Sequence, residues 1–124
     1  MQREPLPWSI TWIEAADGEA GVVMHGPYMP LRAGRYRVTW QIRSVAKKSL
    51  IAVCDVVALG QAEPLARCEV QSGETLISLD FDIPDTTFGI EFRCFSIGNA
   101  GFSILRTVEL EENIERDRRS MVRE

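Results

Sequence analysis

The sequence predicts an all-β fold: an antiparallel β-sandwich of about eight or nine strands, followed by a short C-terminal helix. Three observations predict it. Turn residues recur at roughly ten-residue spacing along most of the 124-residue chain. The segments between these turns alternate apolar and polar residues. From residue 111 onward the sequence becomes charged and helix-favouring. A jelly roll is the first topology to expect, and a barrel is the alternative.

The N-terminal part of the chain predicts three short strands. Trp8–Glu14 alternates apolar and polar residues and ends before an Asp-Gly turn. Gly21–His25 is the second strand. Tyr28–Leu31 is rich in proline, which cannot donate to a ladder of hydrogen bonds, so we expect it at a sheet edge.

The segment Gly26–Ser44 contains the clearest strand signal in the chain. After a glycine turn, every second residue is apolar, which predicts a strand buried on one face only. The buried face holds Tyr36, Val38, Trp40 and Ile42, and the polar face holds Arg35, Arg37, Thr39, Gln41 and Arg43.

The rest of the sandwich follows from the same signals. Leu50–Ala58 is almost continuously apolar, as expected of a central strand. Leu65–Gln71 and Thr75–Ile83 flank Ser-Gly-Glu, which indicates a hairpin. Phe88–Ile97 and Phe102–Leu110 complete the sandwich. In the first of these two we expect Phe88, Ile90, Phe92 and Cys94 on one face, and Glu91, Arg93 and Phe95 on the other.

Two parts of the chain are therefore expected: a sandwich domain over residues 1–110 and a charged helix or connector over residues 111–124. Within the second part, Glu112–Arg116 and Glu115–Arg119 have the i,i+4 spacing that supports a helix. A narrow apolar stripe along this helix suggests packing against the sandwich or homo-oligomerisation through the helix.

Charge and cysteine content restrict the classes of function. The net charge of −4, with acidic and basic residues interspersed, argues against nucleic-acid binding. The chain has no apolar run long enough to cross a membrane, and because its first residues lack the basic and apolar regions of a secretion signal we expect none. Cys54, Cys68 and Cys94 are an odd number without metal-ligand spacing, so we expect buried free thiols and a reducing, cytoplasmic compartment.

Catalysis has little support in the sequence. His25, the single histidine, precedes Gly-Pro at a strand end, so we expect a loop or rim residue rather than a general base. Asp80 and Asp82 share a strand face, as glycosidase carboxylates would, but outward-facing acids are usually solvated. The chain has no D-x-D-x-D-G loop to support a calcium site, and we expect no cofactor.

One set of residues resembles a known family. Gly26-Pro27-Tyr28 with Leu31, Gly34, Tyr36 and Val38, then Gly89, Glu91, Phe92 and Arg93, and finally Val108 and Leu110, resemble galactose-binding-like jelly-roll modules. Similar domains accompany bacterial glycosyltransferases and surface-polysaccharide enzymes, where they look like carbohydrate-binding modules. The resemblance implies a non-catalytic carbohydrate-binding module.

A sugar site needs planar hydrogen-bonding groups and an aromatic platform. If the strands that carry them share a sheet, the arginines of Arg35–Arg43 join Glu91 and Arg93 on one outer face. We therefore predict a ligand site made of Trp12, Tyr28, Arg37, Arg43, Glu91 and Arg93, with Phe95 as a further aromatic candidate.

Three other interpretations stay open: a purely structural role, an interaction domain and a hydrolase. Cross-strand Arg–Glu pairs commonly do no more than keep a sheet face soluble. The same sheet face and the terminal helix would also suit a protein-interaction or oligomerisation domain. A small hydrolase would need Asp80, Asp82 and Glu91 to converge in one cleft.

Overall fold

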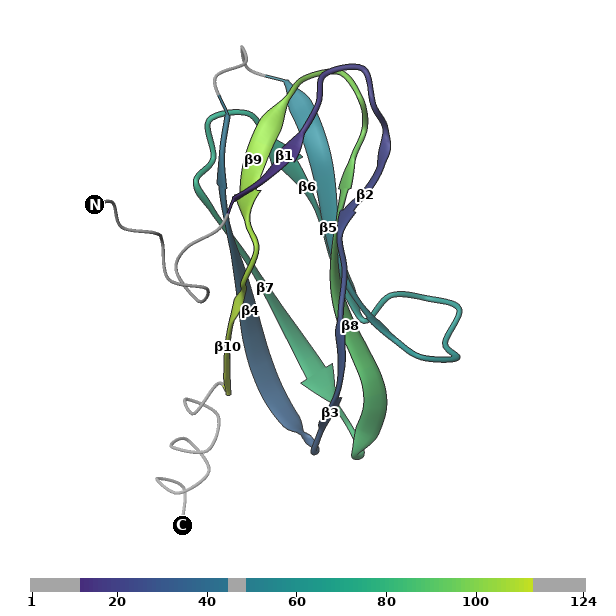
Figure 1. The fold of residues 1–124 in the computed structure, drawn as a ribbon. Helices are drawn as coiled ribbons and strands as arrows, with labels where there is room; N and C mark the ends of the chain where they lie inside the picture. The colour runs from purple at the N-terminus through teal and green to yellow at the C-terminus, as the bar shows by residue number, and fades with distance from the viewer. Residues whose placement is uncertain (1–11, 45–48, 113–124) are drawn as a thin grey trace, which may run out of the picture.

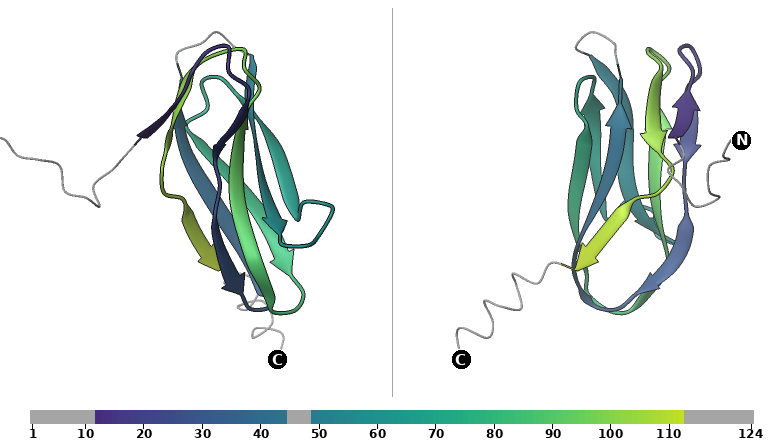
Figure 2. Two further views of the ribbon diagram at one scale, coloured as in Figure 1. Left: turned by 45° about the vertical axis from the view of Figure 1, so that its right-hand side comes forward. Right: turned by 60° about the vertical axis from the view of Figure 1, so that its left-hand side comes forward.

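The computed structural model describes residues 12–44 and 49–112, and these residues form two five-stranded antiparallel sheets packed face to face (Figures 1 and 2). The predicted all-β sandwich is confirmed. Within these two ranges the strands are β1 (Trp12–Ala15), β2 (Gly21–Met24), β3 (Pro27–Leu31), β4 (Gly34–Arg43), β5 (Leu50–Ala58), β6 (Ala66–Gln71), β7 (Leu76–Ile83), β8 (Thr87–Ser96), β9 (Phe102–Leu105) and β10 (Glu109–Glu112).

Each sheet is organised around one long strand. In the first sheet β4 pairs with β7 along one edge and with β9 and β10 along the other, and β1 pairs with β9. In the second sheet β8 pairs with β5 along one edge and with β2 and β3 along the other, and β6 pairs with β5. β3 therefore lies at a sheet edge and β5 in a central position, as predicted.

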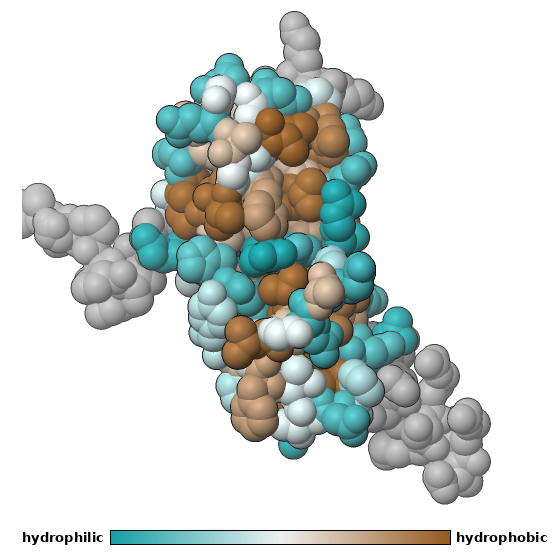
Figure 3. Space-filling view, turned by 90° about the vertical axis from the view of Figure 1, so that its right-hand side faces the viewer, coloured by the Kyte–Doolittle hydropathy of each residue, from teal (hydrophilic) through white to brown (hydrophobic). Residues whose placement is uncertain are grey.

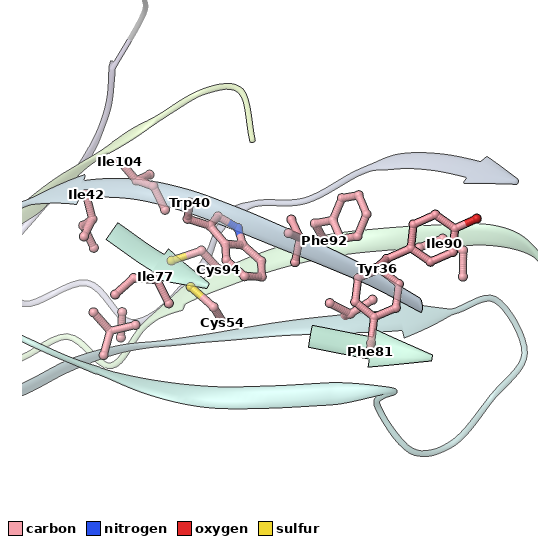
Figure 4. Packing of buried hydrophobic residues seen from close by; sticks show 14 of the residues in the cluster. Tyr36, Trp40, Ile42, Cys54, Ile77, Phe81, Ile90, Phe92, Cys94 and Ile104 are labelled. Atoms are coloured by element: carbon pink, nitrogen blue, oxygen red, sulfur yellow. The ribbon is translucent and has the colours of Figure 1, made fainter. Parts of the chain in front are cut away.

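The core between the sheets is built from alternate positions of these strands (Figure 4). Val38, Trp40 and Ile42 of β4 are fully buried, which confirms the predicted face. The ring of Tyr36 stacks on Phe81 of β7, with ring centroids 5.6 Å apart. Burial of one such large apolar side chain stabilises the fold by about 1.5–3 kcal/mol.

The three cysteines lie side by side across the second sheet. Cys54 on β5 is directly opposite Cys68 on β6 and Cys94 on β8, and all three thiols are free. Cys54 and Cys94 are fully buried, and Cys68 is half-buried. Contact with Cys94 and burial both raise the pKa of the Cys54 thiol, which therefore stays protonated. The prediction of buried structural thiols is confirmed for this pair.

The predicted hairpin between residues 65–71 and 75–83 is wrong. A turn is present, since the backbone N–H of Glu74 donates to the carbonyl of Gln71. However, β6 pairs with β5 in the second sheet, whereas β7 pairs with β4 in the first. The turn thus carries the chain from one layer to the other. A local turn signal specifies a reversal of direction but not the strand that the next segment pairs with.

Two further expectations need correction. The single strand predicted over Phe102–Leu110 is two strands, because β9 ends at Leu105 and β10 begins at Glu109. The helix was expected from residue 111, but Glu111 and Glu112 belong to β10, paired with Arg37 and Tyr36 of β4. The rest of that prediction, residues 113–124, lies outside the described residues, as do residues 8–11 of the first predicted strand.

Phe88 also differs from its prediction. It was expected in the core with Ile90, but 67% of its surface is exposed. Gly89 has a φ of +70°, which interrupts the alternation of the strand. A Cβ atom on Gly89 would lie 2.5 Å from the Cβ of Leu59, so the β5–β6 loop packs where only glycine fits.

Candidate functional site

The residues predicted to form one ligand site lie on two opposite faces of the sandwich. Arg37 and Arg43 project from β4 in the first sheet, whereas Glu91 and Arg93 project from β8 in the second. The two strands face each other through their apolar positions, so their polar positions point in opposite directions. The prediction that these arginines and Glu91 share one outer face is wrong.

The outer face of the first sheet is a network of cross-strand pairs. Arg37 donates to both carboxylate oxygens of Asp80, at 2.7 and 3.2 Å. This hydrogen bonding lowers the pKa of Asp80 below its usual range. Arg35 and Asp82 are also directly opposite each other on β4 and β7, and Nε of Arg35 lies 3.9 Å from Oδ1 of Asp82. These pairs match the interpretation of a solvated sheet face.

Trp12 and Arg43 meet at one end of the first sheet. The Arg43 guanidinium carbon lies 3.8 Å from the centroid of the Trp12 ring, a cation–π contact. Arg43 also lines a hollow of about 680 Å³ with residues of the loops that precede β2 and β9, among them Asp17 and Asn99. One face of the Trp12 ring is covered by Arg43, so that face does not offer a platform for a sugar.

The other three predicted residues come together in a hollow on the outer face of the second sheet. Tyr28, Glu91 and Arg93 line it, and its volume is about 480 Å³. The remaining lining residues are Val22, Val23 and His25. Figure 3 shows this side of the molecule, where two areas of apolar side chains are separated by a band of polar ones. We call this hollow the β8 site.

The local backbone explains why these side chains converge. β2 and β3 both pair with β8, and Pro27 is opposite Glu91 in the register. The backbone N–H of Phe92 donates to the carbonyl of Gly26 at 2.8 Å, which ties the connection between β2 and β3 to β8. Tyr28 has a φ of 64°, uncommon for a residue with a side chain. His25 and Tyr28 are thereby held beside Glu91.

Glu91 is the charged centre of the β8 site. Only 11% of its side chain is exposed, and its Oε2 lies 3.0 Å from Nδ1 of His25, which is 58% exposed. Tyr28 also interacts with Glu91, and its ring lies edge-on to the His25 ring, with the ring centroids 6.5 Å apart. Hydrogen bonding to Glu91, together with the negative charge of that carboxylate, raises the pKa of Tyr28, which therefore stays a neutral phenol at physiological pH.

Arg93 is fixed by a partner beneath the site. Its Nε and Nη2 donate to the two carboxylate oxygens of Asp55 on β5, at 2.9 and 2.8 Å. Hydrogen bonding to Asp55 raises the pKa of Arg93 still further. The guanidinium carbon also lies 4.8 Å from the centroid of the Phe95 ring. Arg93 is thus oriented by two groups of one sheet face, the Asp55 carboxylate and the Phe95 ring.

Sequence reasoning missed two residues of this arrangement. His25 was expected only as a loop or rim residue, whereas it pairs with Glu91 and lines the hollow. Asp55 was read as part of an apolar central strand. A single carboxylate in such a strand was the available signal, because a buried charge needs a partner. For His25 the sequence held no comparable signal, since its partner is 66 positions away.

The structure does not bring together the three acids that the hydrolase interpretation needed. Asp80 and Asp82 lie on the first sheet, and Glu91 lies on the second, so the three acids do not share a cleft. Among residues 12–44 and 49–112, no group of three or more His, Cys, Asp and Glu side chains is placed to hold a metal ion. The same part of the chain contains no helix long and apolar enough to span a membrane.

No protein-family model matches the chain, and neither does any curated protein sequence. Solved structures do match. The C-terminal domain of EclA, described as a sugar-binding protein, is 18% identical with a TM-score of 0.52, over 88% of this chain and 83% of that one. A CBM4 structure is 12% identical with a TM-score of 0.54, over 86% of each chain.

A third similar structure contains the CBM22-1 and GH10 modules of Clostridium thermocellum xylanase Xyn10B in complex with xylohexaose. It is 17% identical with a TM-score of 0.49, over 82% of this chain and 26% of that one. The first two matches show that this chain has the same β-sandwich fold as those domains. At such identities the likeness concerns the fold.

Proposed function

We propose that this chain is a non-catalytic carbohydrate-binding module with a jelly-roll sandwich, and that the β8 site holds the sugar. The observation that carries the proposal is the convergence of an exposed aromatic ring, a nearly buried carboxylate and an oriented guanidinium in one open hollow. The sugar-binding description of the EclA domain, which has the same fold, supports it.

Each side chain of the β8 site suits one part of a sugar. The ring of Tyr28, 55% exposed, offers a flat surface to the apolar face of a pyranose. Glu91 accepts hydrogen bonds from hydroxyl groups, and its low exposure strengthens them. Arg93 has N–H groups beyond the two atoms that bind Asp55, and these donate to sugar oxygens.

The lack of a second acid beside Glu91 among the hollow's lining residues supports binding without hydrolysis. Glycoside hydrolysis by the usual route needs two carboxylates that flank the scissile bond. The nearby carboxylate of Asp55 is buried beneath Arg93 and occupied by it. A bacterial polysaccharide enzyme as the parent protein, a cytoplasmic location and oligomerisation through residues 111–124 stay predictions.

Titration of ¹⁵N-labelled protein with a panel of soluble oligosaccharides tests the proposed function. We expect at least one oligosaccharide to bind with a dissociation constant of about 0.1–1 mM, which corresponds to about 4–5.5 kcal/mol of binding free energy. Shifted amide signals should cluster on β2, β3 and β8. Tyr28→Ala should weaken binding about tenfold, which corresponds to about 1.4 kcal/mol.

Arg37→Ala is the matched control, because it removes a polar side chain from the opposite face of the sandwich. We expect it to leave the affinity unchanged. Loss of binding in Arg37→Ala but not in Tyr28→Ala would move the site to the first sheet and refute the β8 site. Absence of binding to the whole panel would refute the carbohydrate-binding function.

A further inference from the structure

The balance of charge in the β8 site is uneven. Three charged side chains lie in it or directly beneath it: Glu91, Arg93 and Asp55. Arg93 and Asp55 neutralise each other through two hydrogen bonds. Glu91 is left with His25, which is charged only when protonated, and with the neutral phenol of Tyr28. With a neutral imidazole, the site therefore holds one uncompensated negative charge.

The burial of Glu91 strengthens the attraction between its carboxylate and a cation. Its side chain is almost entirely withdrawn from water, so a cation that reaches it is attracted through a medium of low polarity. An anionic ligand would meet the opposite situation. It would approach the Glu91 carboxylate, and the nearby guanidinium of Arg93 already has two nitrogens bound to Asp55.

The rim of the site adds a second feature that suits a cation. The side chain of His25 is 58% exposed, and Tyr28 as a whole residue is 55% exposed. The planes of their two rings form an angle of 69°. An ammonium group beside Glu91 would therefore lie next to an electron-rich phenol ring as well. Aromatic rings combined with a carboxylate are a common way to bind organic ammonium groups.

We propose that the β8 site selects a glycan with free primary amines, such as one built from 2-amino-2-deoxyhexose units, over neutral and acidic glycans. This inference rests on the proposed carbohydrate-binding function and names its ligand class. The ammonium group sits between the Glu91 carboxylate and the Tyr28 ring. Hydroxyls of the same sugar reach the free N–H groups of Arg93.

The test compares four oligosaccharides of equal length by NMR titration at near-neutral pH and low salt. They are a glucosamine oligomer, its N-acetylated form, a cello-oligosaccharide and an oligogalacturonate. N-acetylation removes the charge while it keeps the sugar backbone. We expect the amine form to bind at least about tenfold more tightly than the two neutral forms, and the acidic form to bind most weakly. Added salt should reduce the preference, because exposed charges are screened.

Two variants separate the site from the general charge of the protein, which carries a net charge of −4. Glu91→Gln should abolish the preference, so that the variant binds the amine form no more tightly than it binds the neutral forms. Glu111→Gln removes the same charge from the first sheet, where Glu111 is exposed on β10, and should change nothing. If Glu91→Gln does not fold, the acetylation and salt comparisons on the unmodified protein still decide.

The outcomes distinguish this inference from the proposed function. Equal or tighter binding of a neutral or acidic oligosaccharide at the β8 site would overturn the amine preference and leave the binding function standing. An equal loss of amine binding in Glu91→Gln and Glu111→Gln would show general charge attraction and overturn it as well. If no oligosaccharide binds, both proposals fail.

Discussion

The ion pair between Asp55 and Arg93 provides the most direct test of how the second sheet is stabilised. The two side chains are unequally buried, since 7% of Asp55 and 31% of Arg93 is exposed. Removal of one partner from a buried pair costs about 3–5 kcal/mol when the remaining charge is stranded. The cost should therefore depend on which partner is removed.

Arg93→Ala should be the more damaging change. It leaves the Asp55 carboxylate buried and loses the contact with the Phe95 ring, which is worth about 0.5–1 kcal/mol. We expect a loss of about 3 kcal/mol, near the lower limit for a broken buried pair. Asp55→Ala leaves a guanidinium that reaches water, and we expect about 1–2 kcal/mol.

Urea denaturation followed by tryptophan fluorescence measures these costs. With a slope of about 1.5 kcal/mol/M, Arg93→Ala should lower the unfolding midpoint by about 2 M, and Asp55→Ala by about 1 M. The double variant should be more stable than Arg93→Ala alone, because no unpaired charge remains. The reasoning would be refuted if Asp55→Ala were the more destabilising change, or if the two single costs simply added in the double variant.

Three further predictions concern other parts of the sandwich. Gly89→Ala should lower the free energy of unfolding by at least about 2 kcal/mol, because residue 89 has a positive φ and its new Cβ would collide with Leu59. The added change Leu59→Gly should restore part of that loss in the same denaturation assay. Asp80→Asn should lose up to about 1 kcal/mol at neutral pH, because Arg37 lowers the folded-state pKa of Asp80. The stabilisation is present above the unfolded-state pKa of Asp80 and is lost as the pH falls through its folded-state pKa. The unfolding curves of the variant and the parent should therefore converge in acid. A constant difference in stability at all pH values would contradict this. Trp40→Phe should cost only about 1 kcal/mol by circular dichroism, because the buried indole N–H has no hydrogen-bond partner among the described residues and its removal offsets part of the lost packing; a loss above about 3 kcal/mol would contradict this.

The parts of the fold that could be predicted are those in which one local pattern decides. The alternation of β4 predicted its buried face because a strand has a two-residue period. The partner of β7 could not be predicted in this way. Its turn from β6 is equally compatible with a hairpin and with a crossing between layers, and only the packing of both sheets chooses. Gly89 likewise changed the placement of Phe88 through contact with the distant Leu59.

The site was predicted in part for the same reason. Tyr28, Glu91 and Arg93 were identified by residue type and strand face, and the structure brings them together. Arg37 has the same residue type and the same alternation but belongs to the other sheet, which no local pattern indicates. His25 reaches the site only because β2 and β3 pair with the same edge of β8, a long-range feature.

The alternation of β8 has a practical consequence for protein engineering. Ile90, Phe92 and Cys94 are buried in the core, while the intervening Glu91 and Arg93 line the hollow. The proposed binding positions and the core positions thus alternate along one strand, and Arg93 also stabilises the sheet through Asp55. Libraries that vary residues 91 and 95 but keep Arg93, the partner of the buried Asp55, would change the outer face of this strand without disturbing the hydrophobic interior.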